Sequence, residues 1–376
     1  MIIAGTGIAG APSTSSDIPG WVRFDGGVIT EVGVGDTPPE AAESVDLGDV
    51  VLAPGFIDLQ INGIEEIDFG ATSASGAGEA LTRLARTGCT TCLPTLVTAP
   101  DAAYGPMLDV IAAASELGGA ETRCQVAGVH LEGPFLGGAP GAHPRDLVRA
   151  VDIDALAAWV DRHRDLVRLV TIAPEADRDF TAIRWLRARG ITVAVGHTDA
   201  DFAHVGAAFA AGASMATHLF NGMAPFHHRD PGPVGAAFAA PSVTASLIAD
   251  GVHVHPAVAA MAIAAKTNIA LVTDAVAIHA GSAGGVQLRQ GVDGAAHLLD
   301  GTLAGSSLTL DHALRNVVAW GIGLDRAIDM VTAVPAAAIG LRDRGVLDPG
   351  RRADVVAIDR VSLQVRGVGI AGRRVA

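Results

Sequence analysis

The middle of the chain alternates short apolar runs with longer stretches in which apolar residues recur at helical spacing. The helical stretches include Ile153–His163, Phe180–Arg189 and Pro256–Ala265. This alternation is typical of parallel βα units. The apolar runs that we predict as strands are Gly55–Ile61, Thr90–Leu96, Val126–Glu132, Val167–Ala173, Ile191–Gly196, Ser214–Thr217, Ser246–Ala249 and Ile269–Thr273.

Eight βα units indicate an α/β protein whose body is a (β/α)8 TIM barrel. The alternative is an open, doubly wound sheet. Such a sheet commonly carries a Gly-rich phosphate loop after its first strand, and no such loop follows Gly55–Ile61. The pattern therefore favours the barrel.

Both chain ends have the pattern of strands without helical periodicity. Trp21–Phe24 and Val28–Ile29 flank Asp25-Gly26-Gly27, which predicts a hairpin, and Ala353–Ile358 opens a strand near the C-terminus. Each end is too short to bury a core alone. We therefore expect residues 1–50 and 345–376 to form one small β-sandwich domain beside a barrel at 51–344.

Composition and charge restrict the partners. Among 376 residues, 26 Lys and Arg oppose 40 Asp and Glu, for a net charge of -14. This balance argues against nucleic acid or an anionic membrane as a partner. An anionic small substrate would need a local cluster of positive groups.

The cysteines and the N-terminus indicate a soluble cytoplasmic protein. Three cysteines, Cys89, Cys92 and Cys124, provide no disulfide framework. No second CxxC accompanies Cys89 and Cys92, so we interpret them as core thiols on a strand that points them to opposite faces. The N-terminus lacks a basic segment, and no apolar stretch of about 18 residues follows.

Two histidines and a carboxylate follow the ends of three predicted strands, where a barrel keeps its active site. They are Glu132 in His130-Leu131-Glu132-Gly133-Pro134, His197 in Gly196-His197-Thr198, and His218 in Thr217-His218-Leu219-Phe220-Asn221. A single histidine is more often a hydrogen-bonded structural residue. Together the three form a ligand set with an open fourth position, which is what a catalytic zinc ion requires.

Asp274 ends the eighth predicted strand in Thr273-Asp274-Ala275 and faces the same mouth. Its carboxylate could take a proton from metal-bound water and return it to a leaving amine. The alternative is a helix N-cap at a strand-to-helix turn. Beside a metal set, we favour the catalytic role.

Six ordered motifs closely resemble the N-acetylglucosamine-6-phosphate deacetylases of the amidohydrolase superfamily, and the likeness covers nearly the whole chain. They are Pro54-Gly55-Phe56-Ile57-Asp58-Leu59-Gln60-Ile61-Asn62-Gly63, His130-Leu131-Glu132-Gly133-Pro134-Phe135, Gly196-His197-Thr198, Thr217-His218-Leu219-Phe220-Asn221, Thr273-Asp274-Ala275 and Leu303-Ala304-Gly305-Ser306-Ser307.

The resemblance implies that Glu132, His197 and His218 hold a metal, that Asp274 is the acid and base, and that His143 orients the acetamide carbonyl. It also implies a homodimer acting on an amino sugar phosphate. The alternative for His143 is a solvated loop histidine. The alternative for Arg229 is a surface salt bridge with Asp230. The implied substrate contacts are Ala142, His143, Asn221, Gly222, Arg229, Asp250, Gly251, Val252, His253, Leu303, Ala304 and Gly305.

Relatives with two metals carry His-x-His after the first strand, whereas this chain has Gln60-Ile61-Asn62. Amides are weaker ligands than imidazoles, so we expect one divalent ion per subunit, with zinc first and iron or another divalent ion as alternatives. Two departures from the family pattern are Gly222, often Ala, and Glu65-Glu66, which would add carboxylates near the barrel mouth.

Three rival functions stay open from the sequence alone. They are a deacetylase of another N-acetylated amino sugar, a cyclic amidase, and a non-catalytic sugar-phosphate sensor on the same barrel. The complete set of Glu132, His197, His218 and Asp274 argues against a sensor, because binding alone needs no proton shuttle.

Overall fold

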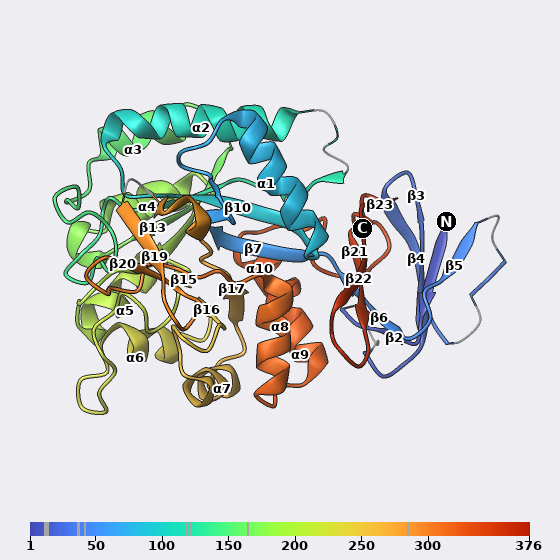
Figure 1. Cartoon of the computed structure of the whole chain (residues 1–376). Coiled ribbons are helices and arrows are strands. Elements are labelled where there is room, and N and C mark those ends of the chain that lie inside the picture. Colours follow the sequence, from blue (N-terminus) through green and yellow to red (C-terminus); the bar gives the residue numbers. More distant parts are fainter. Residues whose placement is uncertain are drawn as a thin grey trace.

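Eight parallel strands of the computed structural model form a barrel that is surrounded by helices (Figure 1). The structure describes residues 1–10, 15–35, 38–40, 43–117, 119, 122–163, 165–283 and 286–376. The predicted TIM barrel is confirmed. In spatial order its strands are β7 (Phe56–Ile61), β10 (Cys89–Val97), β12 (Val129–Glu132), β13 (Val167–Ile172), β14 (Thr192–Val195), β15 (Met215–Ala216), β16 (Thr244–Ile248) and β17 (Ile269–Val272).

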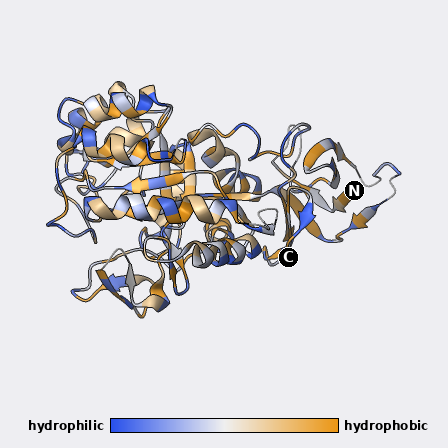
Figure 2. Ribbon diagram, turned by 90° about the horizontal axis from the view of Figure 1, so that it is seen from above, coloured by the Kyte–Doolittle hydropathy of each residue, from blue (hydrophilic) through white to orange (hydrophobic). Residues whose placement is uncertain are grey.

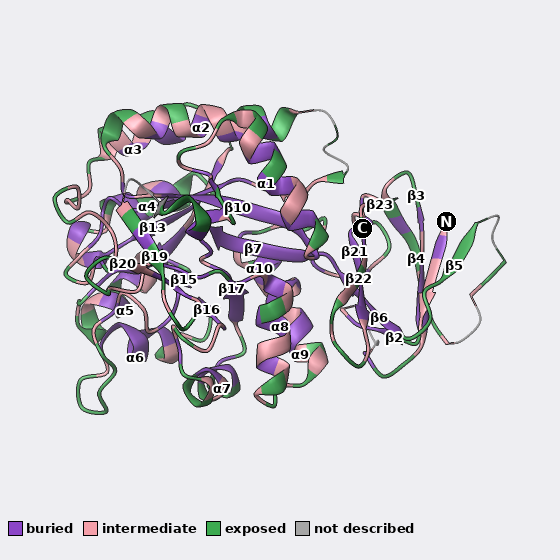
Figure 3. Cartoon of the chain, viewed as in Figure 1, coloured by how far each residue is buried: buried purple, intermediate pink, exposed green. Residues whose placement is uncertain are grey.

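The barrel closes where the first and last strands meet at their carboxyl ends. Ile61 bridges Ala275 in the parallel sense, and the Asp274 N–H donates to Gln60 O over 2.8 Å. Residues of β7 and β10 are almost all buried (Figure 3), as expected for strands covered on both faces. The closure brings the segment after β7 and the segment after β17 to one place.

Helices cover the outside of the barrel, and several begin at side-chain caps. Asp152 accepts hydrogen bonds from two N–H groups of α3, and Asp201 accepts one from His204 of α5. Their apolar faces pack on the strands, whose orange interior is seen from above in Figure 2. The helices are α1 (Ala74–Arg86), α2 (Asp101–Glu116), α3 (Ile153–Val160), α4 (Thr181–Ala188), α5 (Phe202–Ala211), α6 (Gly232–Ala239), α7 (Pro256–Ala265), α8 (Leu310–Ala319), α9 (Leu324–Val331) and α10 (Ala333–Ala338).

Strands from both chain ends lie together beside the barrel, with the two termini in this part of the molecule (Figure 1). One sheet has the order β4 (Val28–Val34), β3 (Gly20–Asp25), β1 (Ile2–Gly5) and β5 (Ser44–Asp46). The other has the order β2 (Gly7–Ile8), β6 (Val50–Pro54), β21 (Val355–Asp359), β22 (Val365–Ile370) and β23 (Arg373–Arg374).

The two sheets share a separate hydrophobic cluster that includes Val22, Phe24, Leu52 and Val355. The expected hairpin around Asp25-Gly26-Gly27 is β3–β4. The division of the chain at residues 50 and 345 stays a prediction.

Three small additions lie outside the regular barrel. The predicted strand Val126–Glu132 is divided, because β11 (Gln125–Val126) pairs with the early part of β10 and β12 with its end. A hairpin of β8 (Gly63–Ile64) and β9 (Ile67–Asp68) follows β7. After β17 comes a sheet of β18 (Ser282–Ala283), β19 (Val286–Gln290) and β20 (Ala296–Leu298).

The three cysteines are free and buried. Cys89 Sγ lies 3.7 Å from Cys124 Sγ. Burial raises the pKa of the Cys124 thiol well above its usual value, so this thiol stays neutral. Among the described helices, none combines the length and the apolar character that a membrane crossing requires.

Candidate active site

Three side chains meet at the carboxyl ends of neighbouring barrel strands. Glu132 Oε1 lies 3.1 Å from His197 Nε2 and 3.1 Å from His218 Nε2. The two Nε2 atoms are 3.0 Å apart. The side chains are only 3%, 7% and 4% exposed, so bulk water does not separate them. The predicted ligand set is therefore assembled.

The orientation of both imidazoles fits a cation between them. His197 Nδ1 is 3.3 Å from Ala139 O, and His218 Nδ1 is 3.1 Å from Asn221 O. A carbonyl oxygen can only accept, so these contacts need protons on both Nδ1 atoms. Both Nε2 atoms then point at each other and at the Glu132 carboxylate, and a divalent cation would be held between these three atoms.

Glu132 carries the negative charge of this set. Burial by itself would favour the neutral acid, but His197 and His218 hold the pKa of Glu132 well below its usual value. Gln60 Nε2 also donates to Glu132 Oε1 over 2.9 Å. An ionised carboxylate with two imidazoles is a donor set typical of zinc and similar divalent metals.

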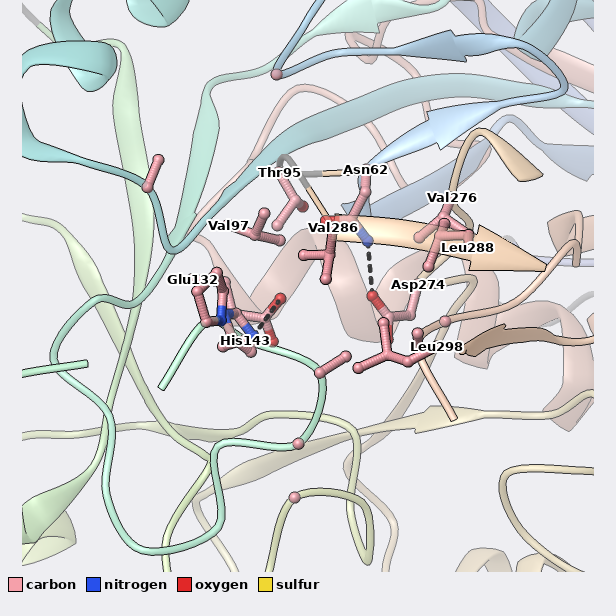
Figure 4. A pocket seen from close by; sticks show the side chains of 18 of the residues that line it. Asn62, Thr95, Val97, Glu132, His143, Asp274, Val276, Val286, Leu288 and Leu298 are labelled. Atoms are coloured by element: carbon pink, nitrogen blue, oxygen red, sulfur yellow. Dashed lines mark hydrogen bonds and ion pairs between the residues drawn. The ribbon is translucent and has the colours of Figure 1, made fainter. Parts of the chain in front are cut away.

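Asp274 lies beside the set and is held by the side-chain amides of Gln60 and Asn62. Asn62 Nδ2 donates to Asp274 Oδ1 over 2.8 Å (Figure 4). Gln60 Nε2 donates to the same oxygen over 3.2 Å. Burial and the charge of Glu132 raise the pKa of Asp274 above its ordinary value. Its second oxygen is left to exchange a proton with a reacting group.

Three of these residues adopt left-handed backbone angles where their strands end. The φ angle is 50° at His197, 26° at His218 and 47° at Asp274. Non-glycine residues rarely adopt such angles, and they recur at functional sites. Here the turns follow directly on β14, β15 and β17.

His143 faces the set as a hydrogen-bond donor. Its Nδ1 lies 2.8 Å from Thr98 Oγ1 and accepts the Thr98 N–H over 3.4 Å. Burial lowers the pKa of His143 to about 3, so the ring is neutral and its proton is on Nε2. His143 Nε2 lies 3.9 Å from Glu132 Oε2, and one ligand atom each of Glu132, His143 and His197 fall within 4.8 Å. Because Nε2 carries a proton, we assign His143 as a donor and not as a metal ligand.

A cavity of about 490 Å³ opens over these groups, within the range of small-molecule sites. Glu132 and His143 lie on one side of it, and Asn62 and Asp274 on another (Figure 4). Gly222 has a φ of +56°, and a Cβ there would lie 2.7 Å from His197 Nδ1, so this chain needs glycine. The predicted substrate contacts that line the cavity are Ala142, His143, Asn221, Gly222, His253, Leu303, Ala304 and Gly305.

Four expected contacts are not among the lining residues: Arg229, Asp250, Gly251 and Val252. Asp250 lies behind the lining, because its Oδ2 is 2.6 Å from Nδ1 of His253, which does line the cavity. Arg229 is exposed, and its Nη1 donates to His228 Nε2 over 2.8 Å. Within the described residues it makes no ion pair with Asp230.

Comparisons with known proteins agree with this geometry. The profile of the Amidohydrolase family matches residues 51–375. This chain belongs to the amidohydrolase family. It is 40% identical over 354 residues to the N-acetylglucosamine-6-phosphate deacetylase of Homo sapiens, covering 89% of this chain and 86% of that protein. It is 37% identical over 335 residues to the N-acetylgalactosamine-6-phosphate deacetylase of Escherichia coli O157:H7, covering 86% and 87%.

A solved structure supports the family assignment. It is a mutant of the N-acetyl-D-glucosamine-6-phosphate deacetylase of Mycobacterium smegmatis in complex with N-acetyl-D-glucosamine-6-phosphate. The TM-score is 0.90 with 32% identity, and the match covers 100% of this chain and 99% of that chain.

The sequence of this amidohydrolase did not reveal every group around the site. Thr98, which fixes His143, follows β10 at the barrel mouth, and that placement could have identified it. The apolar lining carries no sequence signal of its own, because apolar residues are common in every barrel. Its members include Val97, Ala99, Pro100, Ala103, Met107, Val276, Val286, Leu288 and Leu298.

Glu65 and Glu66 do not line the cavity. Both pair with Arg83 of α1, which also pairs with Glu79. Arg83 thus holds the two carboxylates that depart from the family pattern away from the cavity lining.

Proposed function

We propose that the protein hydrolyses the acetamide of N-acetylglucosamine-6-phosphate to glucosamine-6-phosphate and acetate. The observation that carries the proposal is one cavity lined by the Glu132, His197 and His218 set, by Asp274, and by the neutral donor His143. The names of relatives that are 36% to 40% identical over most of the chain support the same substrate.

The Glu132, His197 and His218 set would hold a single divalent ion, and we propose zinc. When bound, such an ion polarises the amide carbonyl and lowers the pKa of the attacking water. The amides of Gln60 and Asn62 stand where a second metal would need imidazoles, and both donate to Asp274 instead. Metal analysis should find one equivalent per active chain, and two equally tight equivalents would contradict this assignment.

Asp274 would transfer the proton, and His143 would stabilise the carbonyl oxygen. Asp274 accepts a proton from the attacking water and later gives it to the sugar nitrogen, so that the amine leaves neutral. The His143 Nε2–H donates to the carbonyl oxygen as negative charge develops there. Their opposite pKa shifts suit these roles, since Asp274 is made a better base and His143 stays neutral.

The sugar phosphate would extend along Asn221, Gly222 and His253 toward Leu303–Gly305. Backbone N–H groups and an imidazole suit a phosphate, but these residues add little permanent positive charge. We therefore propose a homodimer in which the partner subunit's Arg229 reaches the phosphate. The exposure of Arg229 and of Phe226, which is 55% exposed, supports this assembly.

One assay tests the proposed function. Acetate release from N-acetylglucosamine-6-phosphate should be fast, should stop with a chelator, and should return when a divalent ion is added. The unphosphorylated sugar should be a far poorer substrate, because the phosphate-binding groups would be left unpaired. The galactosamine epimer belongs in the same series, since one relative bears that name. Absence of acetate release with every metal tested would overturn the proposal.

A further inference from the structure

The active-site cavity has an apolar arm that none of the proposed roles uses. Its walls come from the segment after β9, from the β10–α2 connection and from the first two turns of α2. The carboxylate of Asp68, two residues before Gly70, also lines the cavity beside these walls. The six other wall residues line the same cavity as Glu132 and Asp274, and none of the six has a side chain that can donate or accept a hydrogen bond strongly. They are Gly70, Ala71, Ala99, Pro100, Ala103 and Met107.

The arm begins next to the group that faces the amide carbonyl. Thr98 holds His143 Nδ1 at 2.8 Å, and its chain neighbours Val97 and Ala99 both line the cavity. In Figure 4 the side chains of Thr95 and Val97 lie between Asn62 and Glu132. Val97 and Ala99 therefore continue the lining from the reacting centre into the arm.

The wall of the arm is built on fixed elements. The hydroxyl of buried Tyr104 donates to Val97 O and accepts the Ala99 N–H, each over 3.3 Å. Ala103 and Met107 are four residues apart and share one face of α2. A Cβ at Gly70 would lie 3.3 Å from Asp68 Oδ1 and 3.6 Å from Met107 Sδ, so the two walls approach closely there, with the Asp68 carboxylate accepting the Gly70 N–H.

The chemistry of the substrate identifies the occupant. An amide carbonyl carbon carries two substituents, the nitrogen with its sugar and the acyl chain. The hydroxyls and phosphate of the sugar need polar partners, which lie at Asn221, Gly222 and His253. An acyl chain needs none, and burying its methylene groups against apolar walls is favourable.

We propose that the arm is an acyl subsite, which lets this enzyme hydrolyse N-propionyl and N-butyryl amino sugar phosphates as well as the N-acetyl compound. Water adds across the amide: the C–N bond breaks, the hydroxyl joins the acyl carbon, and a proton joins the nitrogen. The products are the amino sugar phosphate and a short-chain carboxylate. The inference rests on the proposed function and extends it to a class of acyl groups.

The first test compares N-acetyl-, N-propionyl-, N-butyryl- and N-hexanoyl-glucosamine-6-phosphate on the metal-loaded enzyme. A pocket that ended at the acetyl methyl would reject each added methylene by roughly 10- to 200-fold. With the arm available, kcat/KM for the butyryl compound should stay within about tenfold of the acetyl value. Ala71 and Pro100 are exposed, so the arm opens to solvent and the hexanoyl compound should also be accepted.

A pair of variants on α2 tests whether hydrolysis of the butyryl compound depends on the arm. Ala103→Leu fills it and should lower the butyryl-to-acetyl ratio of kcat/KM at least about tenfold. Ala102→Leu is the matched control, because Ala102 is the exposed neighbour outside the cavity lining, and its ratio should equal the wild-type ratio. Met107→Ala enlarges the arm and should raise the hexanoyl-to-acetyl ratio.

The outcomes separate the two proposals. A failure of the acetyl compound itself would contradict the proposed function. Full acetyl hydrolysis with a loss of ~100-fold or more for the butyryl compound would overturn the acyl subsite alone. An unchanged ratio in both Ala103→Leu and Met107→Ala, in folded protein with normal metal content, would also overturn it.

Discussion

At the scale of single residues, the amides of Gln60 and Asn62 decide what the neighbouring carboxylate can do. Both donate to one oxygen of Asp274, so that oxygen is fixed and the other is available. Asn62 Oδ1 is buried without a hydrogen-bond partner among the described residues, which leaves one acceptor directed at the site. In the proposed mechanism, the amides at these two positions therefore hold the base where relatives with two metals carry imidazoles.

The substitution Asp274→Asn keeps the size of this side chain and removes the base. The turnover number should fall by roughly 10² or more, because proton transfer loses its acceptor. Metal content should stay near one per chain, since Asp274 is not in the proposed ligand set. Steady-state kinetics and metal analysis on the same preparation check both expectations. Near wild-type turnover would reduce Asp274 to a structural residue.

A second buried carboxyl, Asp58, is predicted to make stability depend on pH. Burial raises the pKa of Asp58 to about 7 from 3.8. The folded state therefore binds the proton more tightly, and stability is lost as the pH rises between these two values. Asp58→Asn removes this titration, so the melting temperature of the variant relative to wild type should increase from pH 5 to pH 8.

Over the whole window between the two pKa values this effect is up to about 4 kcal/mol, and the part above pH 5, about two pKa units, is roughly 3 kcal/mol. Asp300→Asn is the control, since Asp300 is exposed at a turn and its pKa is lowered by the Thr302 N–H, so it is ionised throughout this range. A difference for Asp58→Asn that stays flat with pH would show that Asp58 is ionised in the folded protein.

Residue types at strand ends predicted that the three proposed metal ligands and Asp274 lie together, because a barrel gathers the ends of distant strands at one mouth. Position along the chain could not show that Arg229 is exposed and outside the cavity, or that Asp250 lies behind His253. Both depend on loop conformations, which follow from tertiary contacts and not from local pattern. The donor role of His143 likewise rests on Thr98, 45 residues away in sequence.

At the scale of elements, the regular barrel was predictable and the insertions were not. The predicted helix Pro256–Ala265 agrees with α7 at both ends, and the barrel strands agree within about two residues except where β11 separates from β12. The β18–β20 sheet has short strands with many polar residues and gives a weak periodic signal. Yet Val286, Leu288 and Leu298 from this sheet line the cavity (Figure 4).

Leu288→Ala should destabilise the β18–β20 sheet without destabilising the barrel. Leu288 is 8% exposed and packs in a separate cluster with Val276, Ile278 and Ala296. Removal of the Leu288 side chain should lower the local stability of the small sheet by about 2 kcal/mol and raise KM by about tenfold. The melting temperature should change little. Leu299→Ala, at a residue 69% exposed, should change neither quantity. A lower melting temperature with an unchanged KM would place Leu288 in the main core instead.

At the scale of the whole molecule, the net charge and the assembly state both bear on how the protein would bind a phosphate. A protein of net charge -14 that binds a phosphate needs positive groups near it. The lining residues supply His253 and backbone N–H groups, while Arg229 lies on an exposed loop beside His228. An arginine offered by a second copy of the chain would complete the site, and such an arginine would make activity depend on assembly.

Mixed dimers of two impaired variants test this arrangement. In a dimer of Arg229→Ala with Asp274→Asn, one site keeps Asp274 and receives the intact arginine from its partner. That site should work, whereas the other lacks both groups. Each homodimer alone should be impaired, with Arg229→Ala losing about 10- to 100-fold in kcat/KM, the value of one charge-assisted contact.

Equal mixing after dissociation and reassembly should therefore recover roughly a quarter of wild-type activity, because half of the dimers are mixed and each has one complete site. Unphosphorylated N-acetylglucosamine is the internal control, since it never makes the contact and should show no loss in Arg229→Ala. If Arg229 acted within its own subunit, mixing would restore nothing, because no site would hold both Asp274 and Arg229. Sedimentation of a fully active monomer would also contradict the assembly and would return Arg229 to the role of a surface residue.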